Sequence, residues 1–180
     1  MIALIYRQIY HQKGVGNMPY FMTLMSLFTV DSIIKHHIEK DDSVIQKSKA
    51  GGRIVIKRHH NRGAMLNVGD RNQHLIALLS LVFSAFVTGI FVATLGRRGK
   101  GVLKTGLALI LGGAYSNTYD RLRRKYVVDY FSIHLVDAER CTSRLLQKID
   151  GRFSAIVFNL GDFGIIIGAM LLVVSELCSG

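Results

Sequence analysis

The feature that most constrains this chain is one long run without charged side chains. Residues 75–95 are 21 consecutive uncharged and mostly apolar residues. A helix rises about 1.5 Å per residue, so a helix of this length can cross a hydrocarbon core of ~30 Å. The run therefore predicts a membrane-spanning helix.

The charge of the chain has to be interpreted together with its hydropathy. The 180 residues include 23 Lys and Arg and 12 Asp and Glu, giving a net charge of +11, while the mean hydropathy is +0.29. Such a charge is typical of proteins that bind nucleic acid or anionic surfaces, but here basic and apolar residues occupy separate segments. We therefore disfavour disorder and soluble DNA binding, and expect no nucleic acid partner. Two cysteines without CxxC or metal-type spacing exclude a disulfide framework or a zinc ribbon.

Three further apolar segments are expected to be membrane-spanning helices, although each carries some polar residues. They lie at residues 19–38, 102–119 and 153–177. Together with 75–95 they predict an all-α integral membrane protein with four transmembrane helices in residues 18–178. The preceding residues 1–17 form an N-terminal extension to which we assign no function.

Two long connections separate these helices. Residues 39–70 contain two β-like runs, 43–46 and 53–57, joined through Ala50-Gly51-Gly52, which predicts a small hairpin outside the bilayer. Residues 121–152 form the other connection, and 137–149 within it has the composition of a short surface helix. The sequence thus predicts a small β element beside the four helices.

Acidic residues inside the predicted spans need an explanation, because each costs about 2.5–3.5 kcal/mol on insertion scales. If the four helices cross the membrane alternately, the end of the first, the end of the third and the start of the fourth lie at one membrane face. Polar side chains gather at these places: Asp31, Asn117, Asp120, Asp129, Asn159 and Asp162. This gathering predicts a functional site near one surface of the membrane.

Two carboxylates in such a site have a specific chemistry available to them. They cannot both ionise cheaply in a low-dielectric environment, so one proton is shared and the pair can act as general base and general acid. This is the chemistry of aspartic proteases. Asn117 with Asp120, and Asn159 with Asp162, have helical i, i+3 spacing, so each set pairs an amide with a carboxylate if the helix continues. The sequence contains no HExxH, GxSxG or phosphate-binding glycine loop.

Structural interpretations of the same residues stay open. Lys35 is placed to form an i, i+4 ion pair with Asp31, and Arg121 can reach the membrane surface without binding anything. The pairs His36-His37 and His59-His60 contain adjacent residues, whose side chains point in different directions, so we expect no metal site there. We also expect no cofactor.

In five segments the sequence resembles the signal peptidase II family, the bacterial lipoprotein signal peptidases. GGAYSNTYDR at 112–121, VVDY at 127–130 and FNLGD at 158–162 are similar to the motifs GGAxxNxxDR, VVDF and FNxAD. DSIIK at 31–35 and NRGA at 61–64 resemble the more weakly matched DQxxK and NTGA. The five segments follow the family's order along the chain, so chance is a poor explanation.

The resemblance implies a four-helix protease of the bacterial cell (plasma or inner) membrane, multi-pass and independent of a cofactor or metal. Such a protease cleaves the signal peptide of a lipid-modified prolipoprotein before its diacylglyceryl cysteine, so prolipoprotein and membrane lipid are the implied partners. By motif position, Asp129 and Asp162 resemble the catalytic dyad. The implied substrate-binding residues are Asn61, Asn117, Arg121 and Asn159. The implied structural supports are Asp31, Lys35, Gly63, Gly113 and Asp120.

The family also places residues 39–70, as a cradle, and 121–152 on the extracytoplasmic side. Charge counting favours the opposite orientation, since eight Lys and Arg fall in residues 39–74 and eight in 121–152 against four in 96–104. We follow the family, because the basic turn before residue 104 is short and the longer segments are expected to fold.

Several residues depart from the family's motifs. Ser32 replaces Gln, Arg62 replaces Thr, Met65 occupies a usually small position and Gly161 replaces Ala. None of these changes removes a catalytic carboxylate, but they leave an altered substrate range open. Two alternatives are a catalytically silent membrane homologue that binds lipoproteins or lipids, and a proton- or cation-coupled membrane protein that uses Asp31 and Asp162. A faint similarity to GxGD intramembrane proteases is the weakest.

Overall fold

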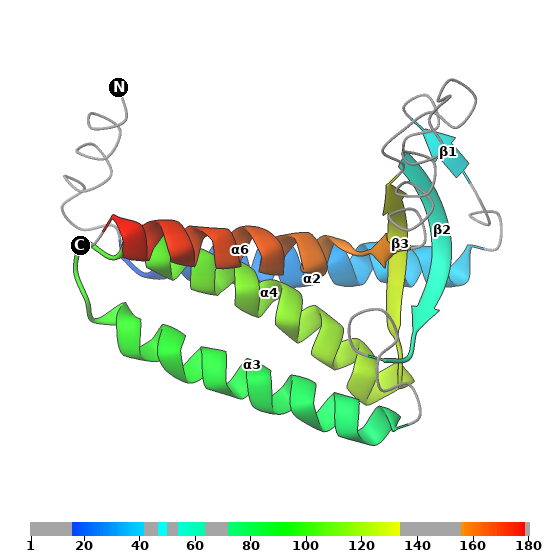
Figure 1. Ribbon diagram of the computed structural model, residues 1–180, viewed down its shortest axis with the longest axis horizontal. Coiled ribbons are helices and arrows are strands. Elements are labelled where there is room, and N and C mark those ends of the chain that lie inside the picture. The colour runs from blue at the N-terminus through cyan, green and yellow to red at the C-terminus, as the bar shows by residue number, and fades with distance from the viewer. Residues whose placement is uncertain (1–15, 42–46, 50–53, 64–71, 134–155, 179–180) are drawn as a thin grey trace, which may run out of the picture. The chain divides into compact units, whose positions relative to one another are not determined.

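A computed structural model of the protein describes residues 16–41, 47–49, 54–63, 72–133 and 156–178 (Figure 1). The helices are α2 (Met18–Lys40), α3 (Gln73–Leu95), α4 (Gly101–Arg124) and α6 (Leu160–Leu177). The strands are β1 (Lys47–Lys49), β2 (Ile54–Asn61), β3 (Val127–Ile133) and β4 (Val157–Phe158). The described part is thus mostly helical with a small antiparallel sheet, which refines the all-α prediction.

The chain divides into two units, each described here by itself. The helical unit comprises Met1–Val30, Leu79–Thr118 and Leu160–Gly180, and the sheet unit comprises Asp31–Leu78 and Tyr119–Asn159. The chain therefore passes from the sheet unit to the helical unit between Asn159 and Leu160.

Small residues let the helices of the helical unit approach one another closely. A methyl group added at Gly106 of α4 would lie 2.8 Å from the carbonyl oxygen of Gly168 on α6, and one added at Gly168 would lie 2.5 Å from the carbonyl oxygen of Gly106. Around this contact the buried core consists of Leu24, Val87, Phe91, Leu107, Ala108, Ile110 and Leu111. The GxxxG spacing of Gly164 and Gly168 therefore serves helix packing.

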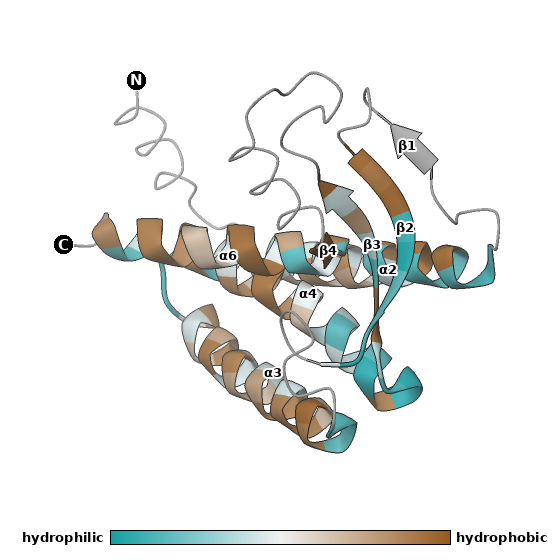
Figure 2. Cartoon of the chain, turned by 45° about the vertical axis from the view of Figure 1, so that its right-hand side comes forward, coloured by the Kyte–Doolittle hydropathy of each residue, from teal (hydrophilic) through white to brown (hydrophobic). Residues whose placement is uncertain are grey.

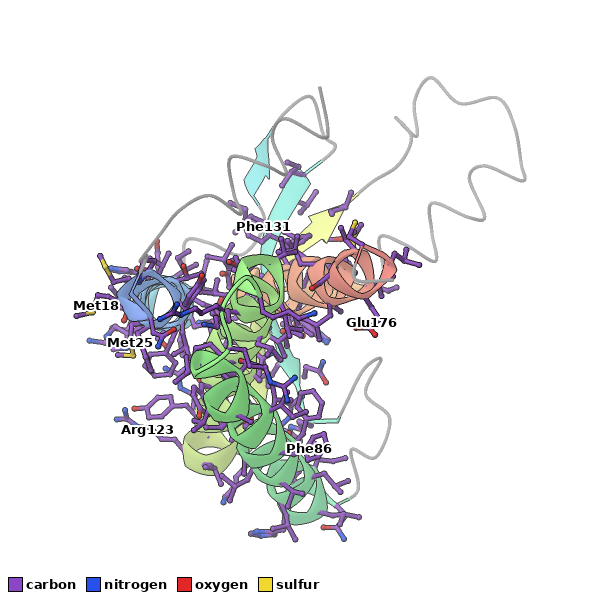
Figure 3. The ribbon with its side chains drawn as sticks, turned by 90° about the vertical axis from the view of Figure 1, so that its left-hand side faces the viewer. Met18, Met25, Phe86, Arg123, Phe131 and Glu176 are labelled. Carbon is purple, nitrogen blue, oxygen red and sulfur yellow. The ribbon has the colours of Figure 1, made fainter. Side chains whose placement is uncertain are left out.

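Hydroxyl groups join α3 to α4. The oxygens of Ser84 and Thr118 lie 3.0 Å apart, and those of Thr88 and Tyr115 lie 2.6 Å apart. The rest of α3 is strongly apolar along its length (Figure 2). Phe86 on α3 and Met25 on α2 stand on the outside of the helices (Figure 3) and are 67% and 55% exposed. Such exposed apolar faces are normal where lipid replaces water.

The described helices agree with the predicted spans in part. The segments 19–38 and 75–95 are helical, as predicted, within α2 and α3. By length and composition, α3 and α6 are the two described helices that could cross a membrane. For α2 and α4 the prediction of a helix is confirmed, and the count of four spans stays a prediction.

The predicted start of the fourth span was wrong. The fourth span was expected from residue 153, but α6 begins at Leu160, and Val157 and Phe158 form β4 instead. Asn159 therefore precedes the helix and does not share a helical face with Asp162. The helix of the third predicted span continues beyond residue 119 to Arg124, where basic residues favour a helix C-terminus, so Asn117 and Asp120 lie in one helix.

An unusual backbone conformation ends α4. Lys125 has φ of 68°, the left-handed region that non-glycine residues rarely adopt. Its N–H donates to the carbonyl oxygen of Arg121 at 3.2 Å, and its Nζ donates to the carbonyl oxygen of Leu122 at 3.4 Å. The chain thereby turns from α4 into β3.

The four strands form one antiparallel sheet in the order β1-β2-β3-β4. Strand β2 pairs with β3 so that His60 faces Val128 and Asn61 faces Val127, with an irregularity between Ile56 and His59. The predicted hairpin is confirmed as the antiparallel pair β1–β2, although β1 lies at 47–49. The predicted run 43–46, the predicted helix 137–149 and residues 1–15 lie outside the described residues.

Candidate active site

Asp129 lies in β3, one of the two inner strands of the sheet, between two amides. Its side chain is buried, with only 2% of the residue exposed. Nδ2 of Asn61 donates to its Oδ2 at 3.1 Å, and Nδ2 of Asn159 donates to its Oδ1 at 2.7 Å. Asn61 ends β2 and Asn159 directly follows β4, so the strands on both sides of β3 supply these donors.

The amide of Asn61 is itself held in place. Its Oδ1 accepts a hydrogen bond from the N–H of Gly63 at 3.2 Å. The carbonyl oxygen of Gly63 accepts one from Nη2 of Arg121 at 3.2 Å. These bonds connect the NRGA segment to the end of α4, and they bring together Asn61, Gly63, Arg121 and Asp129, four of the residues predicted from the motifs.

Asp162 lies in the first turn of α6, in the helical unit. Its Oδ1 accepts a hydrogen bond from Nδ2 of Asn117 on α4 at 2.9 Å. A carboxylate in the first turn is also favoured by the partial positive charge of a helix N-terminus. The structure thus brings together a second pair of the predicted site residues.

Gly113 lies one turn before Asn117 and allows this approach. A methyl group built there would lie 2.8 Å from the carbonyl carbon of Gly161 and 3.0 Å from Cγ1 of Ile165, and it would overlap the carbonyl oxygen of Gly161. Only a residue without a Cβ lets α4 lie this close to the start of α6.

A buried network of charges surrounds the end of α2 in the sheet unit. Nζ of Lys35 lies 2.7 Å from Oδ2 of Asp31 and 3.5 Å from Oδ2 of Asp120, and Oδ1 of Asp120 lies 3.4 Å from Nη1 of Arg124. Asp31 and Lys35 are at most 1% exposed. The i, i+4 ion pair considered from the sequence is confirmed.

Two tyrosines that sequence reasoning missed contact the same face of α2. The hydroxyl of Tyr130 donates to Oδ1 of Asp31 at 2.8 Å, and that of Tyr126 donates to Oε1 of Glu39 at 2.8 Å. Tyr130 stands where the VVDF motif has Phe. The available signal was the spacing of Asp31, Lys35 and Glu39, which places the three on one helical face.

The histidines beside Glu39 have different environments. Nε2 of His60 lies 3.0 Å from Oε2 of Glu39, and its ring stacks on Tyr126 with centroids 4.2 Å apart. Burial, followed by the charges of Lys57 and His60, lowers the pKa of His59 below its usual value. Burial and then the hydrogen bond and charge of Glu39 raise the pKa of Tyr126. Within the part of the chain that the structure describes, no group of three or more His, Cys, Asp or Glu could hold a metal ion.

Comparisons with known proteins agree on one family. The family described as signal peptidase (SPase) II matches residues 23–178. A lipoprotein signal peptidase of Mesorhizobium japonicum is 29% identical over 163 residues, covering 88% of this chain and 85% of that protein. One of Caldicellulosiruptor bescii is 28% identical over 156 residues, covering 86% and 88%.

Two solved structures, both described as a bacterial membrane enzyme, share the fold. One, at 2.3 Å resolution, has a TM-score of 0.69 at 16% identity and covers 88% of this chain and 87% of its own. The other, at 1.9 Å, has a TM-score of 0.68 at 15% identity and covers 88% and 92%. At such identities the likeness concerns the fold alone. Since the family match extends over most of the sequence, this chain belongs to the signal peptidase II family.

Proposed function

We propose that this chain is an aspartic endopeptidase that removes signal peptides from lipid-modified prolipoproteins, cutting before the diacylglyceryl cysteine. Family membership and the two lipoprotein signal peptidases support the activity. The proposed place is the bacterial cell membrane, crossed by four helices, with residues 39–70 and 121–152 on the outer side. The apolar faces of α3 and α6 support contact with lipid.

In this proposal Asp129 and Asp162 form the catalytic dyad. The observation that carries the assignment is the 2.7 Å hydrogen bond from Asn159 to Asp129, because Asp162 follows Asn159 by three residues in the chain. The segment 159–162 therefore supplies an amide donor to the carboxylate of Asp129 and contains the second carboxylate, that of Asp162.

The reaction follows from two carboxyl groups that share one proton. The ionised group takes a proton from water as the water oxygen attacks the scissile carbonyl carbon. The protonated group donates to the leaving amine as the carbon–nitrogen bond breaks. Asp129 and Asp162 supply these two groups, one as the base and the other as the acid.

The remaining predicted site residues take two roles. Asn61, Asn117, Arg121 and Asn159 hold the carboxylates or their neighbours. We assign to the same four residues the orientation of the substrate backbone. In the buried network Lys35 and Arg124 neutralise the carboxylates of Asp31 and Asp120. Gly63 holds Asn61 through its N–H, and Gly113 allows the close approach beside Asp162.

The test is cleavage of a diacylglyceryl-modified precursor by purified protein in detergent. We expect Asp129→Asn and Asp162→Asn each to lower kcat by at least about 100-fold, since general acid–base catalysis contributes that much or more. Glu176→Gln is the matched control, because it makes the same chemical change on the exposed last turn of α6 and should leave kcat unchanged.

Other outcomes would support other functions. A silent homologue would bind the precursor without cleaving it, and would bind equally in both Asn variants. A proton-coupled protein would give a pH-dependent flux in vesicles that is lost in Asp162→Asn. Cleavage at the wild-type rate by either Asn variant would refute the dyad.

A further inference from the structure

Within the sheet unit, α2 and β3 meet through a regular series of polar contacts. On α2 the series uses residues four apart, and on the chain entering and forming β3 it uses residues two apart. We call this series the polar ladder, made of Asp31, Lys35 and Glu39 on α2 and Tyr126, Val128 and Tyr130 on the β3 side.

Each end of the polar ladder is one tyrosine hydroxyl donating to one carboxylate of α2. Tyr130 donates to Asp31 and Tyr126 donates to Glu39, both at 2.8 Å. In the middle, Asp120 bridges the two sides: its Oδ2 lies 3.5 Å from Nζ of Lys35 and accepts the backbone N–H of Val128 at 3.3 Å.

The spacing of the polar ladder follows from the geometry of a helix and a strand. Four residues of α-helix rise about 6 Å. Two residues of strand rise about 6.6 Å. The two repeats agree closely, so three successive contacts can form without bending either element. Because Asp31 meets Tyr130 while Glu39 meets Tyr126, α2 and β3 run in opposite directions.

The tyrosine side chains of the polar ladder belong to one face of the chain forming β3, and Asp129 belongs to the other, while Val128 contributes its backbone N–H in the plane of the sheet. Successive strand side chains alternate between faces, so Asp129 points away from Val128 and Tyr130. That opposite face is where Asn61 and Asn159 donate to its carboxylate. A slip of β3 by one residue would exchange the faces and bring Asp129 toward α2.

We propose that the hydroxyls of Tyr126 and Tyr130 are positioning groups that fix the register of β3 against α2 and so hold Asp129 toward its two amides. The proposal rests on the proposed role of Asp129 in cleavage. Tyr130 has the larger effect, because it is 1% exposed and its partner Asp31 is fully buried, whereas Tyr126 is only half-buried. Water can replace the contact of Tyr126 but not that of Tyr130.

The test compares Tyr130→Phe and Tyr126→Phe with Tyr115→Phe. The control also removes one hydroxyl from a close contact, the 2.6 Å contact with Thr88, but in the helical unit. We measure kcat, KM and the pH dependence of kcat on a diacylglyceryl-modified precursor, and amide hydrogen exchange across β3. The half-buried Tyr126 gives a milder variant should Tyr130→Phe fold poorly.

We expect Tyr130→Phe to lower kcat about tenfold, the factor that corresponds to losing one hydrogen bond to a charged acceptor. KM should stay unchanged, since the tyrosines are not proposed to touch substrate. The pH profile of kcat should shift as Asp129 loses alignment. Tyr126→Phe should have the same effects at smaller size. Both variants should exchange the β3 amides faster than the wild type, while Tyr115→Phe should match the wild type in all four measurements.

Two results would overturn the proposal. One is an unchanged kcat and pH profile in Tyr130→Phe, and the other is unchanged exchange of the β3 amides in both ladder variants. Exchange does not depend on cleavage, so it still decides the question if the wild type fails to cleave the precursor. That failure would count against the proposed function alone.

Discussion

The close contact at Gly113 offers a test of how Asp162 is held. Gly113→Ala adds one methyl group where α4 meets the start of α6. The new carbon would lie 2.8 Å from the carbonyl carbon of Gly161, whereas unstrained carbons stay ~3.5 Å or more apart. The atoms it meets at Gly161 are backbone atoms, which cannot rotate away. The start of α6 must therefore move by roughly 0.7 Å or more.

This displacement acts directly on the hydrogen bond between Asn117 and Asp162. The bond is 2.9 Å long, and the same displacement would lengthen it to about 3.6 Å, beyond hydrogen-bonding distance. Because a misplacement near 1 Å can cost about 100-fold in rate, we expect kcat to fall by about 10- to 100-fold. Overpacking should also lower the free energy of unfolding by about 1–3 kcal/mol.

Two alanine variants separate the local effect from general destabilisation. Gly89→Ala on α3 meets no atom within 4 Å, so it should keep full activity and gain up to about 1 kcal/mol from helix propensity. Gly168→Ala overpacks the α4–α6 contact, because its methyl group would lie 2.5 Å from the carbonyl oxygen of Gly106. This contact is six residues after Asp162 in the chain. Gly168→Ala should lose stability and keep more of its kcat.

The assays are precursor cleavage and denaturant titration in the same detergent. Equal kcat values for Gly113→Ala and Gly168→Ala, at a similar loss of stability, would refute the reasoning. They would mean that the position of Asp162 relative to Asn117 does not limit the reaction.

Two further predictions concern the sheet unit. Lys35→Met leaves the buried carboxylates of Asp31 and Asp120 without their shared cation, so it should lower the free energy of unfolding by about 3–5 kcal/mol. Lys40 is exposed, and Lys40→Met should change the free energy of unfolding little. Similar denaturation midpoints for the two variants would contradict this. The pKa of His59 is lower in the folded protein than in the unfolded chain, so the unfolded chain gains a proton first as the pH falls below 6.5. The stability that neutral His59 contributes to the folded protein is therefore lost on acidification. His59→Gln should therefore show a smaller drop in melting temperature between neutral pH and about pH 5 than the wild type, and an identical drop would contradict it.

The helices could be predicted from the sequence because their signal is local. An apolar run without charge, such as 75–95, is sufficient by itself to predict a helix in lipid. Strand β4 was missed for the opposite reason. Val157 and Phe158 are as apolar as the helix that follows, and only their pairing with Ser132 and Phe131 makes them a strand. That pairing depends on a distant part of the chain.

The candidate site shows the same division. The motifs identified Asn61, Asn159 and Asp129, and the structure brings these three together. They did not identify Tyr126 or Tyr130, because a tyrosine in a strand is ordinarily an apolar residue of the sheet. Its hydroxyl gains a role only when a carboxylate lies opposite, which no spacing within β3 can indicate.

Lys125, where α4 turns into β3, illustrates a compromise between two local demands. A left-handed backbone there is easier for glycine by roughly 1 kcal/mol. Glycine, however, would remove the ammonium that caps the last turn of the helix, an interaction of about 0.3–1 kcal/mol. Since the two effects nearly cancel, replacing Lys125 with glycine should change the stability of this turn little.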